Sequence, residues 1–296
     1  MLILEEHLVP EPSPSTRLSD YAVGIFQNLV SRKSIKKAIK KGCILIDGEV
    51  GTTGRIVCAG MLLQLIEAEN TSSEPFEMDM PIVFEDDHLA VIRKPAGIPV
   101  SGNYYRTVQN ALPSLLKSSP LVDALRIPRP VHRLDGPTAG LLLIGKTSSA
   151  LVQLGRQFEE RLVQKTYQAI VVGETDPEGS ISIPIEDKKA ESHFTRIQTI
   201  PSLKFGHLTL LELRPLSGRT HQLRIHLSQS GWPIVGDSQY SLPETPQHKK
   251  GLFLAATQLK FEHPFNGESF SFSIDAPGKF QSLLERENRR WLKYNS

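Results

Sequence analysis

Apolar residues recur at helical spacing in two segments near the start of the chain. Between residues 18 and 30 they fall three or four positions apart, which predicts an amphipathic helix. The positions concerned are Leu18, Ala22, Ile25, Phe26 and Leu29. A second helix is predicted over residues 31–41, because Ile35 and Ile39 lie one turn apart and Gly42 stands where a helix commonly ends.

Strand patterns follow these helices. Residues 43–50 predict two short strands joined by Asp47-Gly48, a pair typical of a two-residue hairpin turn, and residues 61–68 predict another strand. Six later segments also have the pattern of strands: 81–87, 88–94, 140–146, 167–173, 207–213 and 269–274. Two helices are predicted among them, one over residues 148–164 and one from Thr220 to just before Gly231. The apolar face of the first consists of Leu151, Leu154, Phe158 and Leu162.

The chain divides into four parts on these patterns. Three prolines within residues 1–15 predict an arm whose second half cannot be helical. Residues 16–68 form a small domain, and the polar, aperiodic residues 69–79 predict a linker. Residues 80–296 are long enough for one larger domain. The expected fold class is α+β: a mixed, mainly antiparallel sheet with flanking helices, preceded by a small α+β domain.

Composition excludes few classes of function. The 34 basic and 32 acidic residues nearly cancel, so net charge does not argue for a nucleic-acid partner. Cys43 and Cys58 are too few for a disulfide framework and are expected to be buried apolar residues. The chain starts without a basic signal-peptide region, and no apolar run approaches the roughly 18 residues of a membrane span. We expect a cytoplasmic protein without a membrane partner.

The second predicted helix carries a stripe of lysines. Its members recur at i, i+3, i+4, i+7 and i+8: Lys33, Lys36, Lys37, Lys40 and Lys41. Such a stripe is usually only a solvated face. However, the order of helix, basic helix, Gly, strand, Asp-Gly turn and strand over residues 16–68 resembles the small RNA-binding domain first seen in ribosomal protein S-four. That resemblance implies that the lysine stripe faces RNA phosphates, although Gly60-Met61 replaces the usual Gly-Asp.

Three familiar kinds of chemistry are disfavoured. Residues 140–147 satisfy the phosphate-loop pattern of NTPases, but the four central residues are Leu-Leu-Leu-Ile, which belong in a buried strand. His221 and His226 lie on a predicted helix at a spacing that does not place them on one face, unlike the histidine pair of a zinc helix. No serine-hydrolase elbow is present.

Three segments contain polar residues with open interpretations. Arg133 and Asp135 alternate with Leu134, so an extended segment would project both to one side, as a structural ion pair or as a reactive group. Tyr167 at the start of a strand is more often a core residue. Arg219 and Arg224, near a helix start, could belong to a solvated or salt-bridged face.

A family resemblance decides among these interpretations. The segments 131–147, 162–173 and 216–227 with 233–240 resemble, in this order, the signature motifs of the RluA family of pseudouridine synthases. Residues 82–100 resemble the opening strand and loop of that family, so the likeness spans nearly all of residues 80–290. Three departures are mild: Ala139 replaces the usual Ser, Gly145 the usual Ala and Ser217 the usual Thr.

The resemblance implies an isomerase that converts uridine to pseudouridine in RNA and uses no cofactor and no metal. It assigns the nucleophile to Asp135, the active-site tyrosine to Tyr167 and the partner of the aspartate to Arg224. A neighbouring guanidinium favours the ionised form of a carboxyl group, and its planar fork suits a carboxylate. Arg133 would enter the space left by an extruded uridine, Leu223 would line the pocket, and Lys165 and Arg219 would contact phosphates.

The expected partner is RNA, with ribosomal RNA favoured over transfer RNA, and the protein is expected to be a monomer. The second hypothesis is a catalytically silent RNA-binding protein that keeps the fold. The presence of Asp135, Tyr167 and Arg224 together argues against that hypothesis, since a silent copy has no chemical reason to keep all three.

Overall fold

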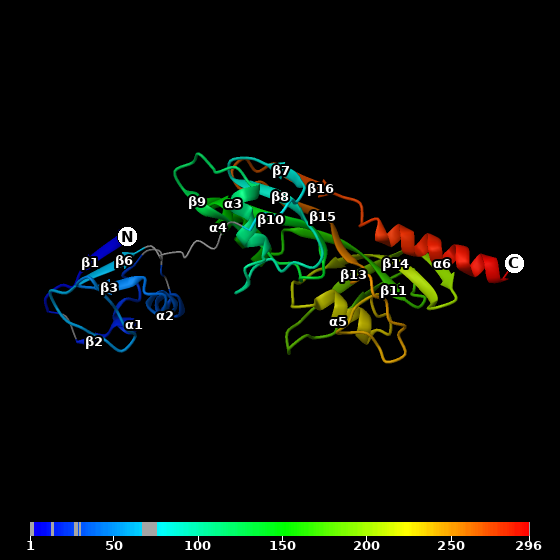
Figure 1. Ribbon diagram of the computed structural model, residues 1–296, viewed down its shortest axis with the longest axis horizontal. Coiled ribbons are helices and arrows are strands. Elements are labelled where there is room, and N and C mark those ends of the chain that lie inside the picture. The colour runs from blue at the N-terminus through cyan, green and yellow to red at the C-terminus, as the bar shows by residue number, and fades with distance from the viewer. Residues whose placement is uncertain (1–2, 13–14, 27–28, 30, 67–75, 296) are drawn as a thin grey trace. The chain divides into compact units, whose positions relative to one another are not determined.

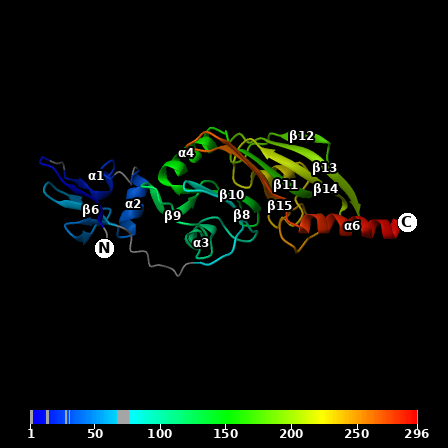
Figure 2. The same cartoon turned by 90° about the horizontal axis from the view of Figure 1, so that it is seen from above.

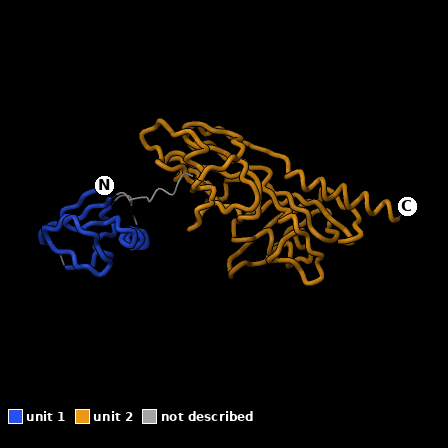
Figure 3. The backbone as a smooth tube through the Cα atoms, viewed as in Figure 1, with its two compact units in different colours: residues 1–74 blue, residues 75–296 orange. Residues whose placement is uncertain are grey.

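The computed structural model describes residues 3–12, 15–26, 29, 31–66 and 76–295, and it divides into two compact units. Unit 1 spans residues 1–74 and unit 2 spans residues 75–296 (Figure 3). The boundary falls within the predicted linker 69–79, whose residues 69–75 lie outside the described residues. No helix in the described ranges is both long and apolar enough to cross a membrane.

Unit 1 is built around a four-stranded antiparallel sheet in the order β1-β6-β3-β4. Its strands are β1 (Ile3–Leu8), β3 (Ile44–Ile46), β4 (Glu49–Val50) and β6 (Leu62–Ile66); β2 (Thr16–Arg17) and β5 (Ile56–Val57) form a separate pair. The predicted hairpin is confirmed, because Asp47 and Gly48 both have positive φ and join β3 to β4. Of the two cysteines, Cys43 is buried and Cys58 is half-buried.

Two predictions for unit 1 need correction. Helix α1 spans only Leu18–Tyr21, because the chain turns after it and Gly24 adopts a φ of +82°, outside helical geometry. The predicted apolar face survives, since Leu18, Ala22 and Phe26 are buried together in the core of the unit. The expected arm contains β1, which pairs along β6 and so belongs to the sheet of this unit.

The lysine-bearing helix α2 (Arg32–Lys40) agrees closely with its prediction. Ser31 caps it through a reciprocal pair of hydrogen bonds with Ser34, and Gly42 follows its end with a φ of +70°. Ile35 and Ile39 are buried, while all five lysines of the stripe are exposed. The helix therefore packs through its isoleucine face and presents its lysine face to solvent.

Unit 2 is organised by one ten-stranded sheet (Figure 1). Its main path runs β12-β13-β14-β11-β15-β10-β8-β7, with β16 beside β15 and β9 beside β10. The strands are β7 (Ile82–Glu85), β8 (Leu89–Lys94), β9 (Ala124–Pro130), β10 (Ala139–Thr147), β11 (Gln164–Val172), β12 (Glu178–Ile181), β13 (Ser192–Ser202), β14 (Gly206–Pro215), β15 (Leu254–Glu262) and β16 (Ser269–Ser273). All pairs are antiparallel except β10 with β15, which confirms the predicted mixed, mainly antiparallel sheet.

Helices cover both faces of the β8–β10 part of the sheet (Figure 2). Ala90, Ile92, Leu142 and Ile144 face one way and pack with α3 (Val108–Leu115). The residues between them, including Val91 and Leu143, face the other way and pack with α4 (Ser148–Glu159). This alternation follows from the two-residue period of a strand. Helix α4 is shorter than predicted, because Arg161 turns the chain with a positive φ and leaves Leu162 57% exposed.

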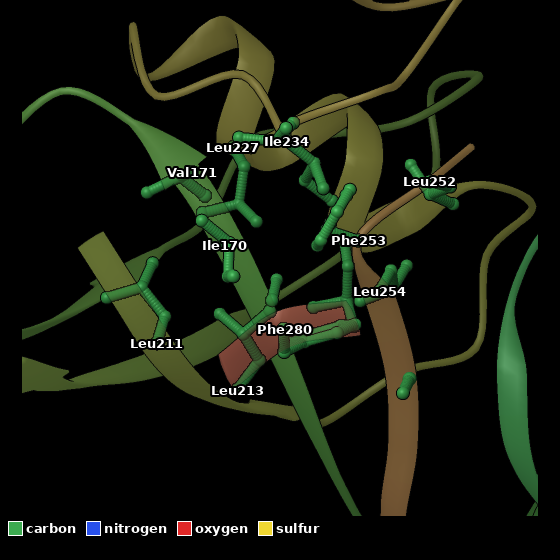
Figure 4. Close-up of a cluster of buried hydrophobic side chains, with 14 of the residues drawn as sticks. Ile170, Val171, Leu211, Leu213, Leu227, Ile234, Leu252, Phe253, Leu254 and Phe280 are labelled. Atoms are coloured by element: carbon green, nitrogen blue, oxygen red, sulfur yellow. The ribbon is translucent and has the colours of Figure 1, made fainter. Parts of the chain in front are cut away.

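The other half of the sheet holds the largest apolar cluster, in which helices α5 (Gln222–Gln229) and α6 (Lys279–Asn295) take part. Leu227 of α5 and Phe280 of α6 pack in the same cluster as Ile170 and Leu211 of the sheet (Figure 4). Helix α5 matches its prediction, whereas α6 was not predicted. This cluster anchors α5 against the strands that carry the candidate site.

The segment that mimics a phosphate loop is the interior of β10. Every residue of this strand is buried, the Nζ atom of Lys146 lies 2.7 Å from a Glu85 carboxylate oxygen, and Thr147 caps helix α4. Lys146 and Thr147 are therefore committed to structural contacts. This arrangement agrees with the expectation that residues 140–147 do not bind a nucleotide.

One glycine allows the centre of the sheet to form. Gly140 pairs with Ala256 of β15 at the parallel contact and has a φ of +121°. A Cβ atom there would lie 2.1 Å from the carbonyl oxygen of Ala256, so no other residue fits without moving a strand. Tyr167 of β11 pairs with Ala256 from the other side. Strand β15 thus joins the strand that follows Asp135 to the strand that carries Tyr167.

Candidate active site

A cleft of about 1070 Å³ opens beside the centre of the sheet. It is lined by all seven residues predicted for the site of the larger domain: Arg133, Asp135, Lys165, Tyr167, Arg219, Leu223 and Arg224. Its described lining contains six lysine or arginine side chains but only two carboxylates, Asp135 and Glu159. The cleft is therefore locally basic although the whole chain has a net charge of only +2.

Asp135 lies in the loop between β9 and β10, and the residue before it anchors it. Leu134 is buried in the core on the α3 side of the sheet, while Arg133 and Asp135 both line the cleft. The backbone N–H of Thr138 donates to the carbonyl oxygen of Asp135 at 3.0 Å and closes a turn over Gly136 and Pro137. The side chain of Asp135 keeps 15% of its surface exposed, so a substrate can reach it.

A buried lysine holds this turn from beneath. The Nζ atom of Lys94 donates to the carbonyl oxygens of Pro95, Gly136 and Thr138 at 2.8–3.0 Å, and the side chain is fully buried. Burial lowers the pKa of Lys94 to about 8, against the opposing effect of the Asp135 charge. The sequence motif pointed to this segment without indicating that its lysine supports the turn of Asp135.

Arg224 uses its fork mainly on a carboxylate that the sequence did not single out. Its Nε and Nη2 atoms donate to the two carboxylate oxygens of Asp237 at 2.7 and 2.8 Å. Its Nη1 atom lies 3.7 Å from Asp135. The expected pairing of Arg224 with Asp135 is thus present as a looser contact, and the bidentate geometry assigned to that pairing belongs to Asp237.

The pair of Arg224 and Asp237 is buried and ionised. Burial raises the pKa of Asp237, but hydrogen bonds from Arg224 and from the backbone N–H groups of Gln239 and Tyr240 outweigh it and lower the pKa overall. Burial also opposes the charge of Arg224, but Asp237 and Asp135 raise its pKa overall. Gly236 makes room for this loop, since a Cβ atom there would lie 2.0 Å from the carbonyl oxygen of Gly251.

Tyr167 projects from β11 into the same cleft. It packs against the apolar clusters on the α3 and α5 sides, and no hydrogen bond of its hydroxyl is found within the described ranges. Burial, followed by the charge of Asp135, raises the pKa of Tyr167 well above its ordinary value. The ring is therefore a neutral phenol at neutral pH, with a face and a hydroxyl available to a ligand.

His221 beside the Asp135 carboxylate, and Tyr240 beside His221, were missed from the sequence. The Nε2 atom of His221 lies 3.6 Å from Asp135 Oδ1, and its Nδ1 atom lies 2.9 Å from the hydroxyl oxygen of Tyr240. The ring of Tyr240 also lies over Arg224, with the guanidinium carbon 4.9 Å from the ring centroid. The segments containing both residues were recognised, but neither residue has a pattern that signals this contact.

The remaining predicted residues take supporting positions. His132, next to Arg133 in the chain, accepts a hydrogen bond from the Leu143 N–H at 3.1 Å and stacks on Phe158. Burial, followed by the charge of Lys165, lowers the pKa of His132 to about 3. Lys165 lies near the Phe158 ring, and burial lowers its pKa. Arg219 donates from Nε to the Lys189 carbonyl oxygen at 3.3 Å.

Two histidines considered as a zinc pair have separate tasks. His226 is fully buried, with hydrogen bonds to Ser192 and to the Ile183 carbonyl oxygen, whereas His221 lines the cleft. In the part of the chain that the structure describes, no group of three His, Cys, Asp or Glu residues could hold a metal ion. Ile225, next to Arg224 in the chain, lines a different hollow.

Comparisons with known proteins agree with the motifs. A family model described as RNA pseudouridylate synthase matches residues 88–229. The ribosomal large subunit pseudouridine synthase D of Nitrosomonas europaea is 33% identical, over 95% of this chain and 87% of that protein. The protein of that name from Pseudomonas aeruginosa is 32% identical over 93% of each chain. The solved structure of human RNA pseudouridylate synthase domain containing 4 is 27% identical, with a TM-score of 0.57 over 69% of this chain and 92% of that one.

Proposed function

The chain belongs to the RluA family of RNA pseudouridine synthases, and on that basis we propose that Asp135 is the nucleophile with which it isomerises uridine in RNA. The observation that best supports this proposal concerns three residues from separate segments of the chain. Asp135, Tyr167 and Arg224 line one basic cleft. The protein is accordingly an isomerase that acts on RNA. The individual roles of its residues form the proposal.

The reaction rearranges one nucleotide without adding or removing atoms. The bond between C1′ of the ribose and N1 of uracil breaks, the base turns, and a bond forms between C1′ and C5. The proton on C5 leaves, and N1 ends with a proton. A carboxylate beside the junction of sugar and base is sufficient for attack, and Asp135 is the carboxylate that the turn over Gly136 presents to the cleft.

Arg224 keeps the charge of this carboxylate compensated. Because Asp237 already fixes two of its donor atoms, the guanidinium is in place before RNA binds and needs no rearrangement during the reaction. We assign Arg224 this role of oriented partner. Its third nitrogen lies 3.7 Å from Asp135, and this loose contact allows the carboxylate to move toward the sugar.

Tyr167 and Leu223 form walls for the detached base. A neutral phenol ring offers a stacking surface and a hydroxyl, while its raised pKa keeps the hydroxyl protonated in the resting enzyme. We therefore assign Tyr167 contact with the uracil. Leu223, buried beneath the cleft, supplies an apolar wall.

The target uridine must leave its stack to reach Asp135, which costs a few kcal/mol. Arg133 is exposed at the cleft beside Asp135, and we assign it to the space that the extruded base vacates. Lys165 and Arg219 line the same cleft and would contact flanking phosphates. The lysine stripe of α2 would add affinity for RNA without reading its bases.

Ribosomal RNA is the proposed substrate. Relatives that match nearly the whole chain are named ribosomal large subunit pseudouridine synthase D, and the lysine stripe suits a phosphate-rich partner. Mapping of pseudouridines in RNA from cells with and without this protein tests the substrate. Loss of a site in transfer RNA, with ribosomal RNA unchanged, would contradict this assignment.

The nucleophile is tested by Asp135→Asn with 5-tritiated uridine in RNA. We expect tritium release to disappear while the affinity for RNA stays nearly unchanged, since Asn keeps the shape of the side chain. Asp187→Asn, at an exposed turn outside the cleft, is the matched control and should release tritium at the normal rate. Equal activity of Asp135→Asn and the unaltered protein would overturn the assignment, and an unaltered protein that binds RNA without releasing tritium would indicate a silent binding protein.

A further inference from the structure

We propose that His221 is a positioning residue that holds the Asp135 carboxylate through its Nε2–H group, with the Tyr240 hydroxyl fixing the imidazole in the required tautomer. This inference rests on the proposed role of Asp135 and adds a second support to that of Arg224. Each oxygen of the carboxylate then has its own partner. His221 lies 3.6 Å from Oδ1, and Arg224 lies 3.7 Å from Oδ2.

The hydrogen bonds of Tyr240 decide which nitrogen carries the proton. Tyr240 accepts a hydrogen bond from the Gln239 side-chain amide at 3.3 Å, which leaves its O–H free to donate to His221 Nδ1 at 2.9 Å. A neutral imidazole that accepts at Nδ1 carries its proton on Nε2, directed at Asp135. The opposite tautomer would direct a lone pair at the carboxylate, and the two would repel each other.

The backbone at His221 supports a functional reason for this residue. His221 precedes α5 with a φ of +55° and a ψ of 21°, in the left-handed region, and its side chain makes no capping hydrogen bond to the helix. Glycine occupies that region more easily, and capping would favour a side-chain acceptor. A histidine here thus incurs backbone strain without improving the helix start, while its ring reaches Asp135.

Tyr240 links both supports of the carboxylate. Its hydroxyl contacts His221, and its ring lies over the Arg224 guanidinium. The backbone N–H of Tyr240 also donates to Asp237 at 3.1 Å, so the loop that fixes Arg224 fixes this tyrosine as well. One loop therefore orients the two groups that address the two oxygens of Asp135.

The first experiment replaces His221 by glycine, which fits the left-handed backbone and removes the imidazole. We expect unchanged or improved thermal stability, unchanged RNA affinity, and a kcat for tritium release lower by about 10- to 100-fold, the effect expected when a reacting group is misplaced. Added imidazole should restore part of the lost rate. Asp187→Gly, at another left-handed position outside the cleft, is the control and should keep full activity.

The second experiment removes only the Tyr240 hydroxyl. Tyr240→Phe keeps the ring over Arg224 and should lower kcat less than His221→Gly does. The double variant should be no slower than His221→Gly alone, because both changes act through one imidazole. Independent, multiplying effects would overturn the proposed link between Tyr240 and His221.

Nitrogen NMR of the full-length protein reads the tautomer directly. The His221 signals should show a proton on Nε2 and an unprotonated, hydrogen-bonded Nδ1. A proton on Nδ1 alone, or activity of His221→Gly within twofold of normal, would overturn the proposal even if Asp135→Asn is inactive. Full activity of Asp135→Asn would instead reject the nucleophile, so the two failures are distinguishable.

Discussion

The lysine stripe of α2 and the cations around the catalytic cleft use positive charge in opposite ways. All five lysines of the stripe are exposed, and none forms an ion pair with the described residues. In the catalytic unit, Lys94 donates to three carbonyl oxygens and Arg224 is held by both oxygens of Asp237. The lysines of the stripe are available to any phosphate, whereas Lys94 and Arg224 already bind partners within the protein.

The exposed lysines should therefore affect the affinity for RNA, whereas the buried cations should affect the geometry of the cleft. Exposed lysines release counterions when they meet RNA, so they raise affinity in a way that depends on salt and tolerates movement. Buried cations lose hydration, and only fixed partners make their burial tolerable. We therefore expect changes to the buried cations to lower kcat and stability, and changes to the stripe to weaken RNA binding alone.

The largest effect is expected from Asp237→Asn. This change leaves the buried Arg224 without its bidentate carboxylate, and breaking a buried ion pair costs about 3–5 kcal/mol. The free energy of unfolding should fall by that amount in urea titrations, and tritium release should fall with it. Glu212→Gln breaks the more exposed pair with Arg214 and should change stability by less than about 1 kcal/mol. Equal losses in the two variants would remove the distinction between buried and exposed charge.

The next effect depends on pH and concerns Lys94. Burial lowers its pKa from the ordinary 10.5 to about 8 in the folded protein, so between these values the unfolded chain binds more protons than the folded one. The free energy of unfolding, compared with that of Lys94→Met, should therefore rise as the pH goes from about 8 to 10.5. The rise should reach about 3 kcal/mol, because a difference of one pKa unit corresponds to about 1.4 kcal/mol. Urea unfolding at several pH values measures it. Lys36→Met, at an exposed lysine, should show no such trend, and a flat difference for Lys94 would refute the prediction.

A smaller effect is expected from replacing Lys36, Lys37 and Lys40 together by alanine. RNA binding should weaken, and the slope of log affinity against log salt should flatten by about 2 to 3, because each cation contributes about 0.7–0.9. The kcat at saturating RNA should not change. The matching triple arginine variant keeps the charges and should keep the slope. An unchanged slope in the alanine variant would mean that the stripe is only solvated.

The smallest effect is local to the stripe. Ser31→Ala removes the side chain that caps α2 and should destabilise the helix by about 1 kcal/mol. Hydrogen exchange of the amides of residues 35–40 in the full-length protein measures this change. Lys33→Ala, at an exposed position within the helix, should alter exchange by less than about 0.5 kcal/mol. Faster exchange in the catalytic unit after Ser31→Ala would contradict a purely local role.

Local patterns predicted the elements well where one segment contains all the information. The Asp47-Gly48 turn, the ends of α2 and the buried strand β10 follow from neighbouring residues. The helix predicted over residues 18–30 was wrong over residues 22–26, because Gly24 takes a left-handed φ that apolar spacing does not reveal. Residues 27, 28 and 30 of that prediction lie outside the described residues. Strand β1 was missed since its partner β6 lies more than fifty residues away.

The sequence pointed to residues that line one cleft but not to their contacts. The order of the motifs pointed to Asp135, Tyr167 and Arg224, and the cleft contains all three. No sequence pattern indicates that the guanidinium of Arg224 binds Asp237 or that His221 faces Asp135. Such contacts depend on the directions of the side chains once the strands have assembled. The sequence around a polar residue does not indicate which distant residue it will contact.

The position of β15 has a consequence for the order in which the protein can mature. Chains emerge from the ribosome N-terminus first, and β15 (Leu254–Glu262) is made long after the strands on either side of it. Until it is inserted, β10 and β11 have no shared neighbour, and the segments bearing Asp135 and Tyr167 have nothing to hold them in register. We expect a nascent chain that ends before residue 254 to be inactive, although it would contain Asp135, Tyr167, Arg224 and Asp237. We therefore expect catalytic competence only after β15 has been synthesised and has paired with both strands.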